Sequence, residues 1–133
     1  MLLSRARGKY IRHVRRYFLK PSITTLEKKL TGLKQKIVGI GDIRPGSLSK
    51  QYNVCGSPSC RCKANPPQKH GPYFKITATR KGKSSCRFVK EEELPIIEDQ
   101  LKNFKRLRTL VDEWIELGSQ IADMRLTREL KEK

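Results

Sequence analysis

The chain has 133 residues, of which 36% are hydrophobic and 32% are charged, and its formal net charge is +17. A chain of this length and polarity forms one small domain, or a small module carried on helices, since it is too polar for one thick core and too apolar for full disorder. No apolar run is long enough for a membrane span or a secretory signal, so the sequence predicts a cytoplasmic protein.

The first predicted element is a basic N-terminal helix or arm, residues 1–20, which ends before Pro21. It contains seven Lys or Arg and no acid. Residues 22–38 predict a first coiled-coil helix, with Ser22 as the N-cap and leucines at three- and four-residue steps in an apolar seam.

Residues 42–89 are expected to form a separate module. Residues 42–72 are rich in Gly, Pro, Ser and Cys, and no regular element of length fits them. Residues 73–89 alternate apolar and polar side chains on either side of Lys81 and Gly82, which predicts a β-hairpin.

The last element is a long helix over residues 91–130, with three glutamates in its first turn, where the helix dipole favours anions. Its apolar stripe includes Trp114, an expected core residue, and is long enough to pair with residues 22–38. The part that outruns this partner is a candidate surface for a homodimer or a partner protein. The predicted fold class is α+β, mainly α: an antiparallel helical hairpin or coiled coil with a small metal-stabilised β-hairpin module at its tip, and the basic N-terminal helix.

Positive charge is concentrated in the arm and the module. Residues 44–90 contain eleven Lys or Arg and no acid, whereas residues 91–133 hold eight bases and eleven acids. A long acid-free segment repels itself, and a polyanion relieves this repulsion with release of counterions. The pattern indicates nucleic-acid binding and a protein associated with the nucleoid or with ribonucleoprotein.

The candidate metal ligands form one cluster, Cys55-x4-Cys60-x-Cys62-x7-His70. Three thiolates and an imidazole can close a tetrahedral, structural Zn²⁺ site, and clustered cysteines in a reducing compartment favour metal over disulfides. Cys86 is an alternative fourth ligand, although its place on a predicted strand favours a small buried core residue. Two other interpretations are a set of free, redox-sensitive thiols and a His70 that contacts phosphate.

The predicted nucleic-acid contacts are basic side chains of the arm and the module, with two tyrosines that could stack on bases or pad a core around the metal. They are Arg5, Arg12, Arg15, Arg16, Arg44, Lys50, Tyr52, Arg61, Lys63, Lys69, Tyr73, Lys75, Arg80, Lys81, Lys83 and Arg87. The hairpin turn holds the densest group of cations, and a two-stranded ribbon with a basic tip can enter a groove.

These observations predict a nucleic-acid-binding accessory protein without catalytic residues. It would bind the phosphate backbone through a zinc-stabilised basic module and the basic N-terminal helix. The alternatives are a metal-dependent nuclease or hydrolase, and an adaptor at a protein or membrane surface. Metal nucleases generally need carboxylates, and residues 43–90 contain none, so no enzyme is expected.

Three short motifs resemble those of a family of small uncharacterised prokaryotic proteins, a domain of unknown function. They are RPGSL at residues 44–48, CGxxxCxC at residues 55–62 and HGPY at residues 70–73, followed in that family by a β-hairpin and a long helix. The similarity covers roughly residues 42–126. It implies a prokaryotic or phage-like origin and a link to mobile elements, which slightly favours DNA over RNA, and it favours His70 over Cys86 as the fourth ligand.

Overall fold

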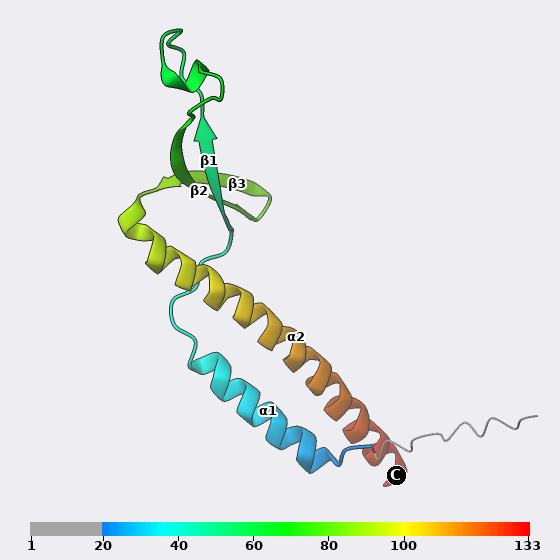
Figure 1. Cartoon of the computed structure of the whole chain (residues 1–133). Helices are drawn as coiled ribbons and strands as arrows, with labels where there is room; N and C mark the ends of the chain where they lie inside the picture. The colour runs from blue at the N-terminus through cyan, green and yellow to red at the C-terminus, as the bar shows by residue number, and fades with distance from the viewer. Residues whose placement is uncertain (1–19) are drawn as a thin grey trace, which may run out of the picture.

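The computed structural model describes residues 20–133, which form an α+β fold with two long helices and a three-stranded antiparallel sheet (Figure 1). The elements in chain order are α1 (Ile23–Val38), β1 (Ser47–Asn53), η1 (Arg61–Lys63), β2 (His70–Arg80), β3 (Lys83–Val89), η2 (Glu91–Glu93) and α2 (Leu94–Lys131). Residues 54–69, here called the cysteine loop, extend beyond the sheet at the end remote from the helix pair. The predicted N-terminal helix, with Arg5, Arg12, Arg15 and Arg16, lies outside the described residues.

Helix α1 begins and ends where its local sequence predicts. The Ser22 side chain accepts a hydrogen bond from the Thr25 N–H at 3.3 Å, which satisfies one of the backbone donors left free at a helix N-terminus. At the other end, the Gly39 N–H donates to the Gln35 carbonyl at 3.0 Å. Leu26 and Leu33 are the buried residues of this helix.

Helix α1 packs along the later part of α2, and the two helices run in opposite directions. The early residue Glu27 meets Arg125 at 2.6 Å, and the later Lys34 lies over the ring of Trp114, 5.1 Å from its centroid. The prediction that Trp114 is a core residue is wrong, since 39% of it is exposed. The residue lies at the rim of the helix pair, where the Lys34 side chain lies over its ring.

The sheet has the order β1-β2-β3, and β1 was not predicted. Its sequence, SLSKQYN, has one apolar residue that meets the core, Leu48, which pairs with Ile76 of β2. An edge strand of this kind is specified by its partner's backbone hydrogen bonds more than by its own side-chain pattern. Gly46 permits its entry: its φ is +129°, and a Cβ there would lie 2.5 Å from the Thr77 carbonyl oxygen.

Strands β2 and β3 form the predicted hairpin around Lys81 and Gly82. These two residues have φ values of +51° and +75°, as a two-residue type I′ turn requires. The register pairs Phe74 with Val89, and Val89 is the buried residue of β3. The prediction of a buried Cys86 is therefore wrong, because alternation along the strand turns it to the opposite, exposed face.

The sheet packs on the first part of α2 and makes a core separate from that of the helix pair. Ile76 and Val89 of the sheet meet Ile97 and Leu101 of α2, with Leu48, Phe74 and Leu94 around them. Arg44 ties the start of the module to α2, since its Nε donates to Gln100 Oε1 at 2.7 Å. Within residues 20–133, no helix is both long and apolar enough to cross a membrane.

A short network joins β3 to the start of α2. The Lys90 N–H donates to Glu93 Oε2 at 2.9 Å, and Arg87 makes an ion pair with Glu93 at 3.1 Å. The Lys90 N–H and, second to it, the Arg87 guanidinium hold the pKa of Glu93 below its usual range. The glutamate-rich turn η2 thus fixes the direction in which α2 leaves the sheet.

Candidate metal centre

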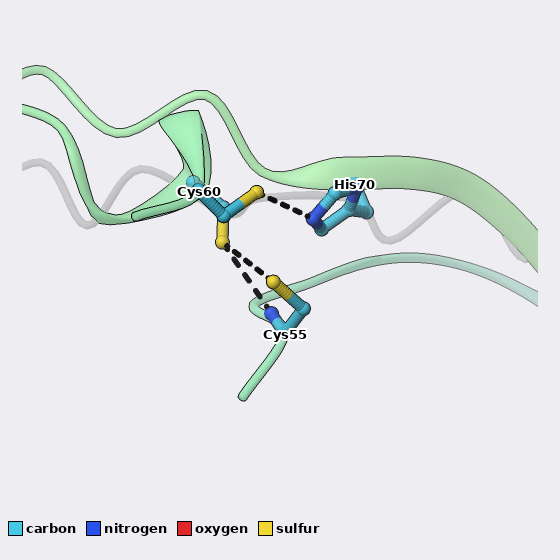
Figure 2. Close-up of side chains that lie close together, drawn as sticks. Cys55, Cys60 and His70 are labelled. Carbon is cyan, nitrogen blue, oxygen red and sulfur yellow. Dashed lines mark hydrogen bonds between the residues drawn. The ribbon is translucent and has the colours of Figure 1, made fainter. Parts of the chain in front are cut away.

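Four potential metal ligands converge where the cysteine loop leaves and rejoins the sheet. Cys55 follows the end of β1, Cys60 and Cys62 lie at η1, and His70 is the first residue of β2. Figure 2 shows the side chains of Cys55, Cys60 and His70 pointing toward one another. The ligand atoms of all four residues lie within 4.8 Å of one another.

The distances within the cluster approach those of a tetrahedral site. Cys60 Sγ lies 3.2 Å from His70 Nε2, and Cys55 Sγ lies 3.5 Å from Cys62 Sγ. Around a tetrahedral zinc ion, ligand bonds of about 2.3 Å for sulfur and about 2.0–2.1 Å for nitrogen separate neighbouring ligand atoms by about 3.5–3.8 Å. The residues present could therefore hold one metal ion with small side-chain movements.

Burial and hydrogen bonds divide the thiols into two kinds. Cys62 is 2% exposed, and burial raises the pKa of its thiol. Cys60 is half-buried, and hydrogen bonds, first from the backbone of Cys62 and then from the Cys62 and Cys55 side chains, lower its pKa to about 6. The lowered pKa favours the thiolate form of Cys60, which is the form that binds metal.

Gly71 allows β1, which leads to Cys55, and β2, which begins at His70, to lie close together. Its φ is +130°, and a Cβ there would lie 2.8 Å from the Gln51 carbonyl oxygen and 3.1 Å from Tyr52 Cδ1. The pairing of β1 with β2 shifts register at this point and resumes with Asn53 opposite His70. The end of β1 that leads to Cys55 is therefore held beside the imidazole.

Cys86, the alternative fourth ligand, lies elsewhere. It is exposed on β3 opposite Thr77, and the group of four potential ligands among the described residues does not include it. The geometry brings His70 to the three clustered cysteines.

The predicted nucleic-acid contacts fall into two groups in the structure. Arg44 and Arg87 are engaged with Gln100 and Glu93 of the α2 region, so they hold the module to the helix. The remaining predicted residues of the module are exposed, apart from the half-buried Lys75. They are Lys50, Tyr52, Arg61, Lys63, Lys69, Tyr73, Arg80, Lys81 and Lys83.

A basic hollow between the hairpin and α2 was missed in the sequence. It is open, has a volume of about 860 Å³, and is lined by Arg80, Lys105 and Arg108 together with Ser and Thr hydroxyls of the sheet. Lys105 and Arg108 were not singled out in the sequence, because residues 91–133 contain more acids than bases. Their three-residue spacing, beginning four residues after the buried Leu101, was the available signal that they lie near the sheet.

The comparisons with known proteins identify a family and nothing more specific. A family model described as a domain of unknown function, DUF6788, matches residues 23–99, which include α1, the whole sheet and all four candidate ligands. Neither the curated proteins nor the solved structures gave a match to the chain. The resemblance to an uncharacterised family is therefore confirmed.

Proposed function

This chain belongs to the DUF6788 family, and we propose that it is a nucleic-acid-binding accessory protein whose basic module is held together by a structural zinc ion. The observation that carries the proposal is a four-ligand cluster inside a segment of 47 residues, 44–90, that contains eleven Lys or Arg and no acid. DNA is slightly favoured over RNA, through the resemblance to a family linked with mobile elements.

The donor set supports zinc as the metal. Three cysteines and one histidine are typical of structural zinc sites, and four protein ligands leave no open position for a reacting water. Cys62 is the one buried residue of the cysteine loop, so this loop has no apolar core that could fold it alone. The ligand residues would provide the contacts that an apolar core provides elsewhere.

The exposed cations support a polyanion as the partner. Arg80, Lys81 and Lys83 lie in and beside the hairpin turn, and further cations project from the cysteine loop. The hollow lined by Arg80, Lys105 and Arg108 adds a second place where phosphates could lie. We further propose that α1 and α2 form an antiparallel coiled coil that carries this module at its tip, and that the predicted N-terminal helix adds a separate basic contact.

The outer part of α2 supports a second association. Three apolar side chains of this helix are 56–65% exposed and are therefore not covered by α1: Ile115, Leu126 and Leu130. A homodimer or a protein partner could cover these residues.

Binding measurements at several salt concentrations test the proposed function. Fluorescence anisotropy with a labelled DNA duplex is expected to give an affinity that falls steeply with salt, by about 0.9 in log–log slope for each phosphate contact. Replacing Arg80, Lys81 and Lys83 by alanine should lower this slope by up to about 2.7. Replacing Lys28, Lys36 and Lys131, which are exposed on the helix pair, removes the same charge and should leave most of the slope.

Two results would count against the proposal. Salt-insensitive binding, or no binding to DNA or RNA, would contradict the polyanion partner. Metal analysis of the purified protein should give one zinc per chain, and a protein free of metal with its cysteine loop intact would contradict the structural role.

A further inference from the structure

The sheet has one face toward α2 and one face that no described helix covers. Ile76 and Val89 belong to the face that packs on α2. Alternation along β2 and β3 places Tyr73, Lys75 and Phe88 on the other face. That face is open, since Phe88 is 62% exposed and Tyr73 is 43% exposed.

Two exposed rings flank one cation on this open face. Phe88 of β3 pairs directly with Lys75 of β2, and Tyr73 precedes Lys75 by two residues on the same strand. Tyr73 and Phe88 are thus diagonal neighbours, which in antiparallel sheets lie about 7–8 Å apart. The sequence alone did not single out Phe88, because strand alternation does not reveal which face of a hairpin is buried.

Exposure of Phe88 is unlike that of the other phenylalanines in the described chain. Phe74 and Phe104 are half-buried, as is usual for a side chain with no polar group. The exposed rings of Phe88 and Tyr73 lie in a segment, residues 44–90, that contains no carboxylate. This combination suits a ligand that is both flat and anionic. Of the three carboxylates that follow β3, Glu93 is engaged by Arg87 and Glu92 lies 3.9 Å from Lys90.

We propose that this open face is a stacking platform for single-stranded nucleic acid, with unpaired bases on Phe88 and Tyr73 and phosphates at Lys75 and at Lys81 in the hairpin turn. The inference rests on the proposed function and specifies the form of nucleic acid. Bases in a duplex are stacked on one another and their faces are hidden, whereas single strands offer a free π-face for each ring.

The bound nucleic-acid strand would run along β2 between two basic ends of the module. At one end lies Lys81 at the tip of the hairpin turn. At the other end Tyr73 lines a small hollow with Asn53, Val54, Cys55 and His70. The metal cluster would then set the position of one ring of the platform through the strand that begins at His70.

Anisotropy measurements with labelled single-stranded DNA, single-stranded RNA and duplex DNA of matched length test the inference. The wild-type protein is expected to bind a single strand more tightly than the duplex at equal salt. Phe88→Leu keeps an apolar side chain and removes the ring, so Kd for the single strand should rise about tenfold, with the salt slope unchanged. Phe88→Tyr should stay within about twofold of the wild type, because a phenol ring also stacks.

Ile96→Ala is the matched control, because Ile96 is also 62% exposed but lies on α2. It should leave all affinities unchanged. Tyr73→Leu provides a second variant on the platform and should weaken single-strand binding in the same direction. Circular dichroism with zinc present verifies that each variant is folded.

The outcomes separate the inference from the proposed function. If Phe88→Leu and Tyr73→Leu bind the single strand as the wild type does, or if the duplex is preferred, the platform is refuted while polyanion binding stands. If no nucleic acid binds at any salt concentration, both fail. The DNA and RNA arms identify which single strand the platform takes.

Discussion

Gly71 is the position where one added methyl group should disturb both the sheet and the metal centre. In Gly71→Ala the new Cβ would lie 2.8 Å from the Gln51 carbonyl oxygen, a backbone atom that cannot rotate away. The residue also has a φ of +130°, which L-amino acids with a side chain rarely adopt. Either β1 must move away from β2 or Gly71 must change its backbone conformation.

The expected magnitude follows from these two effects. A non-glycine residue in a sparsely populated backbone region costs about 1–3 kcal/mol, and the close approach to Gln51 adds to this. His70 directly precedes Gly71, so a shift that relieves the contact displaces the imidazole from the three cysteines. If the whole penalty falls on the metal-bound state, zinc affinity weakens by roughly 5- to 150-fold, at tenfold for each 1.4 kcal/mol.

Competition with a chromogenic chelator measures the zinc affinity, and urea denaturation with zinc present measures the free energy of unfolding. Gly56→Ala makes the same chemical change between Cys55 and Cys60, where a Cβ would meet nothing within 4 Å. It should alter the free energy of unfolding by no more than about 0.5 kcal/mol. Wild-type zinc affinity and stability in Gly71→Ala, or equal losses in both variants, would refute the reasoning.

Three further predictions concern the core, pH and the metal. Ile97→Ala should lower the free energy of unfolding in urea by about 2–5 kcal/mol, because Ile97 is 3% exposed in the sheet core, whereas Ile96→Ala, at a residue 62% exposed, should change it by about 0.5 kcal/mol or less. The pKa of Glu93 is held below its ordinary value of 4.5, so the stability that its carboxylate contributes is present above that value and is lost as pH falls through the lowered pKa. The melting temperature of Glu93→Gln should therefore fall less than that of the wild type between about pH 5 and pH 2. Parallel curves of melting temperature against pH for the two proteins would contradict this prediction. Removal of metal by a chelator should speed amide hydrogen exchange in the cysteine loop and leave the helix pair protected, and uniform loss of protection would show that the two parts do not unfold separately.

The helices and the hairpin could be predicted because local signals specify them. Ser22, as the N-cap, and Gly39, as the terminating glycine, mark the two ends of α1. Lys81-Gly82 is a strong turn signal, and both residues have the positive φ values that the turn requires. The four candidate ligands could be identified from residue type and spacing. In each case the information lies within a few neighbouring residues.

The rest depends on contacts between segments distant in sequence. β1 exists because β2 pairs with it, and its own residues carry no clear alternation of apolar side chains. The exposure of Cys86 and Phe88 follows from which hairpin face α2 covers, and either choice agrees with alternation along β3. The role of Arg44 likewise required knowledge of Gln100, 56 residues later in the chain.

Among the elements of residues 20–133, α2 is the one that takes part in both cores, and this gives the described protein a fixed span. The sheet core centres on Ile97 and the helix pair reaches Arg125, where it meets Glu27 near the start of α1 (Figure 1). At about 1.5 Å per residue, these two places on the helix are roughly 40 Å apart. Lys20, the first described residue after the basic arm, therefore stands at the opposite end of the protein from the cysteine loop. The distance between the two places on α2 is a little more than one turn of duplex DNA, about 34–36 Å, so α2 sets the separation between the sheet and the start of α1.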